Sequence, residues 1–215
     1  MPRPPRISSK KFFYHVFARG NNREQVFWET ADYQRFLKNL ELYQEKFGYR
    51  LYGYCLLANH FHLLLRPGKI SLSKIMQVLM TAYSMYANKK HHRVGHVFQG
   101  RFKSIIVEKD TYLLEVLRYI HLNPIRAGIV DRVEEYPWSS YLKYLTAGSE
   151  KPTVETAEML SMFSPDGLRQ KRLFVEFTEG GLGQDFDPEQ TQVRGVLGSA
   201  KFFQSLTRVL KGRRP

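Results

Sequence analysis

The pattern of hydrophobic and polar positions predicts four short strands and three longer helices between residues 12 and 123. Apolar runs of strand length occupy residues 12–18, 49–57, 60–65 and 105–108. Between these runs, apolar residues recur three and four positions apart, as in helices packed on a core, over residues 30–47, 71–90 and 111–123. Gly48 is expected to end the first helix and Pro124 the third.

The order of these elements predicts the fold class. Strand, helix, strand, strand, helix, strand, helix fits an α+β fold of ferredoxin-like type, an antiparallel sheet with helices on one face. A polar linker of small residues at 146–152 suggests a main domain over 1–150 and a helical accessory segment over 151–215. In that segment, helical patterns span 153–178 and 192–210, and we expect it to lie outside the main domain.

Two histidines stand at the centre of the most apolar stretch, residues 54–66, which read YCLLANHFHLLLR. Ala58 and Asn59 predict a tight turn or bulge just before them. Side chains alternate along a strand, so His60 and His62 point to one face and Phe61 points to the other. Two imidazoles side by side can bind a divalent metal ion, or can form an ordinary hydrogen-bonded pair, and the spacing leaves both open.

Charge narrows the class of partner. The formal net charge is +13 and the sequence pI is about 9.8, which indicates nucleic acid or another anionic surface. No run of eighteen apolar residues predicts a membrane span, and the basic, proline-rich start lacks the apolar core of a secretory signal. A single cysteine, Cys55, excludes an internal disulfide and suits the cytoplasm.

Basic residues gather in three segments that are candidates for contact with nucleic acid. The arm at 1–11, the turn-rich loop at 19–23 and the glycine-punctuated loop at 89–104 are each rich in lysine and arginine. The third loop also carries phenylalanines, so it suits a loop that follows phosphates and stacks bases, although a solvated loop is the simpler alternative. The candidate DNA-binding residues are Arg3, Arg6, Arg19, Arg23, Arg93, Gln99, Arg101 and Lys103.

A tyrosine and an amide lie on one flank of the third helix. At 100° per residue, Tyr119 and Asn123 fall one turn apart and off the apolar stripe formed by Leu113, Leu117 and Ile120. This flank could face the histidines. A half-exposed tyrosine without a chemical role is the alternative that spacing alone leaves open.

Five blocks of sequence resemble a known family. YHVFARGNNR at 14–23, YGYCLLANHFHLLL at 52–65, GHVFQGRFKS at 95–104, YLLEVLRYIHLNPIRAGIV at 112–130 and YPWSSY at 136–141 follow in that order. The set resembles the HUH single-strand DNA endonucleases, and among them the bacterial single-tyrosine transposases of the REP-associated branch. The resemblance implies a divalent metal ion, Mg²⁺ or Mn²⁺, held by His60, His62 and Asn123, with Tyr119 as the nucleophile. Asn123 stands where better-known members have glutamine.

This resemblance implies an enzyme that nicks and rejoins single-stranded DNA at hairpins through a 5′-phosphotyrosine linkage. The alternative is a hairpin-binding protein that does not cut and has a structural or regulatory role, and an RNA-binding metal protein is a weaker third hypothesis. The sequence leaves monomer and homodimer both open.

Overall fold

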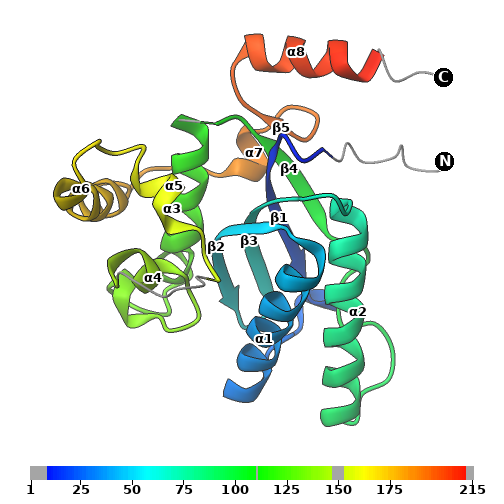
Figure 1. Cartoon of the computed structure of the whole chain (residues 1–215). Helices are drawn as coiled ribbons and strands as arrows, with labels where there is room; N and C mark the ends of the chain where they lie inside the picture. Colours follow the sequence, from blue (N-terminus) through cyan, green and yellow to red (C-terminus); the bar gives the residue numbers. More distant parts are fainter. Residues whose placement is uncertain (1–8, 110, 147–152, 212–215) are drawn as a thin grey trace.

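Five strands form one sheet at the centre of the molecule (Figure 1). The computed structural model describes residues 9–109, 111–146 and 153–211, so Arg3, Arg6 and most of the 146–152 linker lie outside the described residues. The strand order is β2-β3-β1-β4-β5. The first four strands pair antiparallel, and β5 pairs parallel with β4. The strands are β1 (Phe13–Arg19), β2 (Arg50–Leu57), β3 (His60–Arg66), β4 (Lys103–Val107) and β5 (Val196–Leu197).

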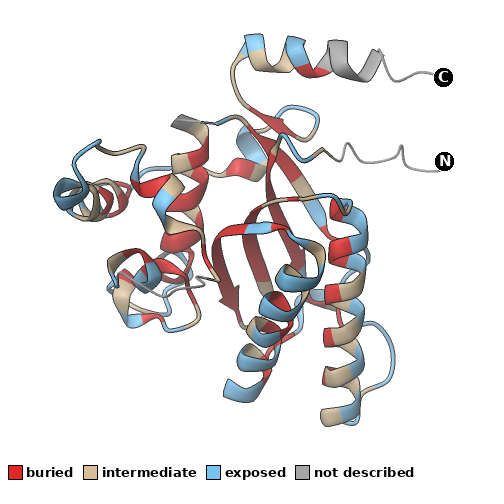
Figure 2. Ribbon diagram, viewed as in Figure 1, coloured by how far each residue is buried: buried red, intermediate tan, exposed pale blue. Residues whose placement is uncertain are grey.

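Helices cover both faces of the sheet, whereas the sequence pattern predicted one face. Helices α1 (Thr30–Phe47) and α2 (Leu72–Lys90) pack together on the face to which Phe61 points, where Phe61 lies 4.9 Å from the Phe36 ring of α1. Helix α3 (Thr111–Arg126) covers the opposite face, the one to which His62 points. Both faces of the central strands are therefore buried (Figure 2). The long uninterrupted apolar runs already indicate such two-sided burial.

Helix α3 continues through Pro124, so the prediction that this proline ends the helix is wrong. Proline lacks an N–H and normally breaks a helix interior. Here Leu117 and Ile120 are buried against the sheet and hold the helix in place. The Asn123 side-chain amide donates to the Tyr119 carbonyl at 2.7 Å, which adds a hydrogen bond in the turn that the proline weakens.

The last third of the chain packs onto the sheet and α3 instead of lying apart from them. The Phe174 ring lies 5.8 Å from the His121 ring of α3, and the backbone amides of Ile106 and Glu108 donate to the Gly195 and Leu197 carbonyls across the β4–β5 edge. The expected helix at 192–210 is in fact β5 followed by α8. The division at residue 150 stays a prediction. The other helices are α4 (Tyr141–Leu145), α5 (Thr156–Leu160), α6 (Gly167–Glu179), α7 (Pro188–Thr191) and α8 (Ala200–Lys211), with 3-10 turns at Asn21–Arg23 and Val133–Glu135.

Candidate functional site

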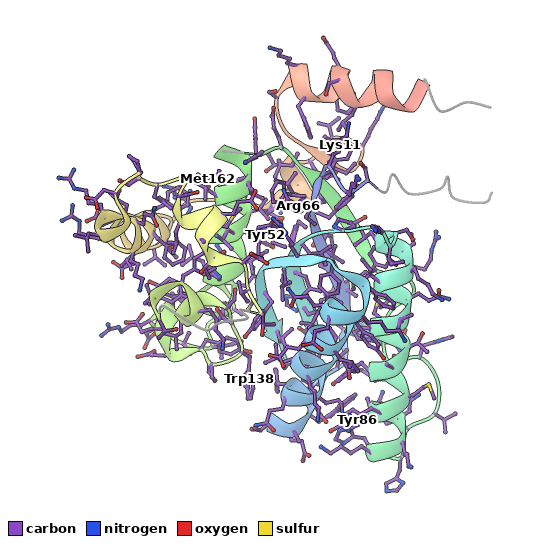
Figure 3. The ribbon with its side chains drawn as sticks, in the orientation of Figure 1. Lys11, Tyr52, Arg66, Tyr86, Trp138 and Met162 are labelled. Atoms are coloured by element: carbon purple, nitrogen blue, oxygen red, sulfur yellow. The ribbon has the colours of Figure 1, made fainter. Side chains whose placement is uncertain are left out.

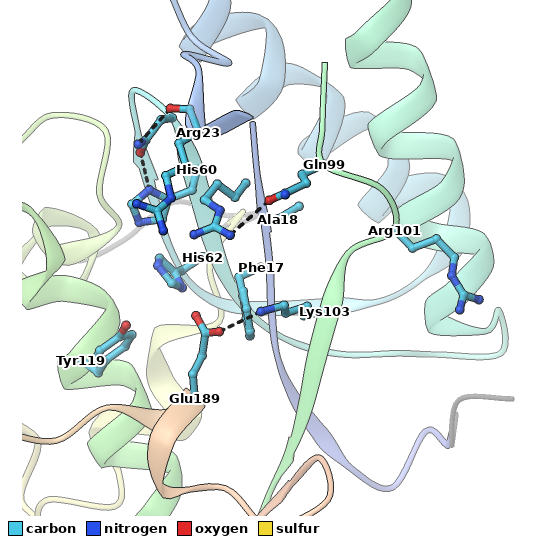
Figure 4. A pocket seen from close by; sticks show the side chains of 12 residues that line it. Phe17, Ala18, Arg23, His60, His62, Gln99, Arg101, Lys103, Tyr119 and Glu189 are labelled. Atoms are coloured by element: carbon cyan, nitrogen blue, oxygen red, sulfur yellow. Dashed lines mark hydrogen bonds and ion pairs between the residues drawn. The ribbon is translucent and has the colours of Figure 1, made fainter. Parts of the chain in front are cut away.

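A pocket of about 310 Å³ opens between α3, α7 and the ends of β1 and β3 (Figure 4). Segments far apart in sequence supply its walls, and most of the predicted site residues lie in it. The side chains that line it are those of Phe17, Ala18, Arg19, Arg23, Asn59, His60, His62, Gln99, Arg101, Lys103, Tyr119 and Glu189.

His60 and His62 both face this pocket, as the alternation of strand side chains predicted. The Ala58-Asn59 turn joins β2 to β3 directly before His60. The Asn59 side-chain oxygen lies 2.6 Å from His60 Nδ1, so Nδ1 carries the proton and donates it. The other ring nitrogen of His60, Nε2, therefore keeps its lone pair available for a ligand.

A third histidine, His15 of β1, contacts this pair, and our sequence analysis did not identify it. His15 Nε2 lies 2.9 Å from His62 Nδ1. The His15 side chain is fully buried, and among the described residues its Nδ1 has no hydrogen-bond partner. One signal was present in the sequence, because His15 is the single strongly polar residue in the apolar run at 12–18.

Burial keeps these imidazoles neutral. It lowers the pKa of His60 to about 4, with a smaller contribution from the Arg19 charge. Burial also lowers the pKa of His62 well below its ordinary value, aided by the neighbouring His15 and His60, and that of His15 to about 3. At neutral pH the rings therefore carry lone pairs that are ready to bind a cation.

Tyr119 lies across the pocket from the strand histidines. Its ring meets the His62 ring edge-on at 5.6 Å, and the Arg126 guanidinium lies over its face at 5.1 Å. Burial raises the pKa of the phenol to about 12, and Asp187 and Glu189 raise it too, whereas Arg126 and the Asn123 amide lower it. The phenol is therefore protonated at neutral pH and needs help to react.

Asn123 does not line the pocket. Its side chain is largely buried and its amide group donates to the Tyr119 carbonyl. In the described part of the chain, no group of three His, Cys, Asp or Glu side chains is arranged to hold a metal ion. The ring nitrogens of His60 and His62 are the predicted metal-binding atoms that line the pocket, and the Glu189 carboxylate lines it too.

Five of the predicted DNA-binding residues share this pocket. Arg19 donates to the Gln99 side-chain oxygen at 3.1 Å, and Lys103 forms an ion pair with Glu189 at 3.2 Å. The five residues are Arg19, Arg23, Gln99, Arg101 and Lys103. They come from different segments, and Figure 4 shows Gln99 and Lys103 close to the histidines, whereas the Arg101 side chain points away from them.

Other predictions for the basic loop differ from the structure. Arg93 lies outside the pocket, where it pairs with Glu24 at 2.7 Å and covers the Trp28 ring at 5.0 Å. Phe98 and Phe102 are buried in the core, so they cannot stack on bases as the loop composition suggested. The buried rings instead hold the loop in place. The backbone N–H of Gln99 also donates to the backbone carbonyl of Arg19 at 2.8 Å.

Glu189 of α7 is a pocket residue that sequence reasoning missed. It brings a carboxylate to a basic pocket and comes from a region that we expected to lie elsewhere. Phe186, three residues earlier, packs against Tyr119 at 6.4 Å between ring centres, while Arg126 donates to the Phe186 carbonyl at 2.8 Å. These contacts make the 184–189 stretch one wall of the site.

The fold and pocket define an α+β protein with a histidine pair and a facing tyrosine in a basic pocket. The family model for IS200-like transposases matches residues 8–123, slightly more than half of the chain, and the chain belongs to this family. The resemblance noted from the sequence blocks is thus confirmed.

Two relatives support this assignment. A protein of Haemophilus influenzae (strain Rd) assigned as a REP-associated tyrosine transposase is 25% identical over 108 residues, 45% of this chain and 61% of the relative. The chain thus spans about three-fifths of that relative's length. A solved structure of a REP-associated tyrosine transposase bound to a REP hairpin aligns with TM-score 0.59 and 17% identity, covering 71% of this chain and 94% of the other. The second match confirms the α+β fold.

Proposed function

We propose that this chain is a metal-dependent transposase that nicks and rejoins single-stranded DNA at hairpins through a 5′-phosphotyrosine intermediate. The observation that carries the proposal is the contact between the Tyr119 ring and the His62 ring in a pocket walled by basic side chains. Core packing alone does not require these residue types to meet. The similar solved structure, a REP-associated tyrosine transposase bound to a REP hairpin, supports hairpin DNA as the substrate.

The residues present fit a divalent metal ion. His60 Nδ1 is occupied by Asn59 and His62 Nδ1 by His15, so both Nε2 atoms are the nitrogens left for a metal. Mg²⁺ or Mn²⁺, when bound, would polarise the scissile phosphate. Imidazole ligands suit Mn²⁺ better than Mg²⁺, which prefers oxygen. Asn123 stays a predicted third ligand that would have to leave the Tyr119 carbonyl.

Tyr119 supplies the attacking oxygen in this proposal. Its phenolic oxygen forms a bond to the phosphorus while the bond from phosphorus to the 3′ oxygen breaks. The phenol gives up one proton and the leaving 3′ oxygen gains one, so the proton count balances. One phosphodiester is exchanged for another, and for this reason the DNA end can later be joined to a new hydroxyl without ATP.

The basic side chains position the DNA backbone. Arg19, Arg23, Arg101 and Lys103 can neutralise phosphates on either side of the tyrosine, and Gln99 can donate to a phosphate or a base. Arg3, Arg6 and Arg93 stay predicted contacts to DNA beyond the pocket.

A DNA substrate supports the cytoplasm as the place of action. In the described residues, no helix combines the length and apolar character that a membrane crossing needs.

A hairpin-binding protein that does not cut is the second candidate. Two observations favour it: the pKa of Tyr119 is raised to about 12, and the Glu189 carboxylate shares the pocket with the tyrosine. Both features disfavour a reactive phenolate. The two functions differ in whether a covalent adduct forms.

The test is a Tyr119→Phe variant incubated with a hairpin oligonucleotide and Mn²⁺. It should form no covalent adduct, because the ring remains and the nucleophilic oxygen is gone. Hairpin affinity should stay near that of the original protein. Mass spectrometry of the trapped peptide should locate the adduct of the unmodified protein on Tyr119.

Tyr112→Phe, a change on the same helix, is the matched control and should leave the adduct intact. EDTA should stop adduct formation and spare most binding. An adduct on another tyrosine would overturn the mechanism, and binding with no adduct under any metal would support the second candidate.

A further inference from the structure

His15 and His62 form a hydrogen-bonded pair of imidazoles behind the pocket. They lie on the neighbouring antiparallel strands β1 and β3, where His62 pairs with Phe17 and His15 with Leu64. Their ring planes differ by 20°, and the bonded nitrogens are 2.9 Å apart. The rings are nearly parallel with their centres 5.1 Å apart, and the short distance between the two nitrogens allows one N–H to donate to the lone pair of the other ring.

The direction of this hydrogen bond decides whether His62 can bind a metal ion. A neutral imidazole has one N–H donor and one lone pair. If His62 Nδ1 donates to His15, the lone pair of His62 is on Nε2. If His15 Nε2 donates instead, His62 Nε2 carries the proton and cannot be a ligand. Rotation of the His62 ring would break the hydrogen bond between His62 Nδ1 and His15 Nε2.

We propose that His15 is a positioning residue that accepts the Nδ1 proton of His62 and so directs the lone pair of His62 Nε2 into the pocket. This inference rests on the proposed metal site at His60 and His62. Asn59 does the same for His60, because its side-chain oxygen can only accept. His60 and His62 therefore each have their own hydrogen-bond acceptor: Asn59 of the β2–β3 turn for His60, and His15 of β1 for His62.

The surroundings of His15 explain how the geometry is kept. Two aromatic rings lie beside it: the Phe17 ring is 5.1 Å away and the Tyr119 ring 5.9 Å away. Nothing in the described residues hydrogen-bonds His15 Nδ1, so His62 is its one observed hydrogen-bond partner. A histidine that served packing alone would be replaced by phenylalanine without effect on His62. A positioning residue would not.

The experiment compares two substitutions at this position. His15→Phe keeps a flat ring and removes the acceptor, whereas His15→Gln places a side-chain oxygen near the position of Nε2. Mn²⁺ affinity, measured by electron paramagnetic resonance of the free ion, should fall by about 10–100-fold in His15→Phe. It should return to within a few-fold of the original in His15→Gln. Hairpin binding in EDTA checks that both variants are folded.

His121→Phe is the matched control, because His121 is also fully buried but bonds Ser140 at 2.8 Å, away from the pocket. It should leave Mn²⁺ affinity unchanged. In the protein bound to Zn²⁺, a diamagnetic probe, ¹⁵N NMR should show His62 Nδ1 protonated.

Unchanged Mn²⁺ affinity in His15→Phe, or failure of folded His15→Gln to restore it, would overturn the inference. If affinity falls as expected but the unmodified protein forms no Tyr119 adduct, the positioning role stands and the proposed function fails. If the adduct forms and His15→Phe binds Mn²⁺ normally, the proposed function stands and the positioning role of His15 fails.

Discussion

The two faces of the sheet differ although they are built from the same strands. On one face, Val16, Phe61 and Leu63 are fully buried under α1 and α2 (Figure 3 shows the side chains of both layers). On the other face, His15 and His62 pack near Tyr119 of α3. Neighbouring residues of a strand thus serve different purposes. The period of two allows one face to stabilise the fold while the other is free to carry chemistry.

The largest effect expected from this comparison is on stability. Phe61→Ala should lower the free energy of unfolding by about 3–5 kcal/mol, because it leaves a cavity among Phe36, Phe98 and their neighbours. Phe17→Ala, the same change on the pocket face, should cost less than Phe61→Ala, because the pocket already opens beside Phe17. Urea titrations measure both. Equal losses would mean that the two faces contribute alike to stability.

Acid should destabilise the fold through its buried neutral histidines. Burial lowers the pKa of both His15 and His121 to about 3, so the unfolded chain binds protons that the folded chain cannot. Between about pH 6 and pH 4, each should remove about 1.4 kcal/mol of stability per pH unit. Urea titrations across this pH range should show that the free energy of unfolding declines less steeply in His121→Gln than in the original protein.

His96→Gln, a change at an exposed position, is the control and should keep the full decline. If His121→Gln declines as steeply as the original protein, the buried neutral histidines do not account for acid sensitivity.

Charge removal at the pocket should weaken DNA binding without loss of fold. Replacing Arg101 and Lys103 with alanine should reduce hairpin affinity and lower the slope of log affinity against log salt by roughly 0.7–0.9 for each phosphate that is no longer neutralised. Fluorescence anisotropy over a salt series measures this slope. Lys38 and Lys46, both exposed on α1 over the other face, give a double-alanine control with the same change in charge. An equal effect in the control would show that net charge alone matters.

The smallest effect concerns the carboxylate in the pocket. Glu189→Gln removes a negative charge beside Lys103 and Tyr119, so hairpin affinity should rise by up to about five-fold. The pKa of Tyr119 should fall, because the Glu189 charge raises it. Spectrophotometric titration of the phenol and anisotropy test these two expectations. Glu176→Gln, an exposed position on α6, should change neither, and a decrease in affinity for Glu189→Gln would contradict the electrostatic argument.

Local patterns predicted most of the fold between β1 and α3. Apolar periodicity located β1 to β4 and α1 to α3 to within a few residues, and alternation placed His60 and His62 on one face. The end of α3 was wrong because contacts of Leu117 and Ile120 with the sheet outweigh the preference of Pro124 to end a helix. Intrinsic propensity is overridden where tertiary packing is strong.

Residues that meet only through distant segments were not predicted. His15 joins the site through the pairing of β1 with β3, and Glu189 through the packing of the last third of the chain. The strand β5 has only two residues, too few for any periodicity to show. Arg93 and Phe102 belong to a loop whose composition suggested DNA binding. Composition does not say which side chains face outward: Arg93 pairs with Glu24 and Phe102 is buried.

The parallel pairing of β5 with β4 has a consequence for how the protein is made. The edge of β4 is covered by Val196 and Leu197, and the preceding stretch at 184–189 also forms one pocket wall. A ribosome must therefore synthesise the chain past residue 197 before this edge is covered and the pocket wall is in place. A product cut short by an early stop codon would retain the histidine pair and the tyrosine, yet would expose an open strand edge prone to pairing with other chains.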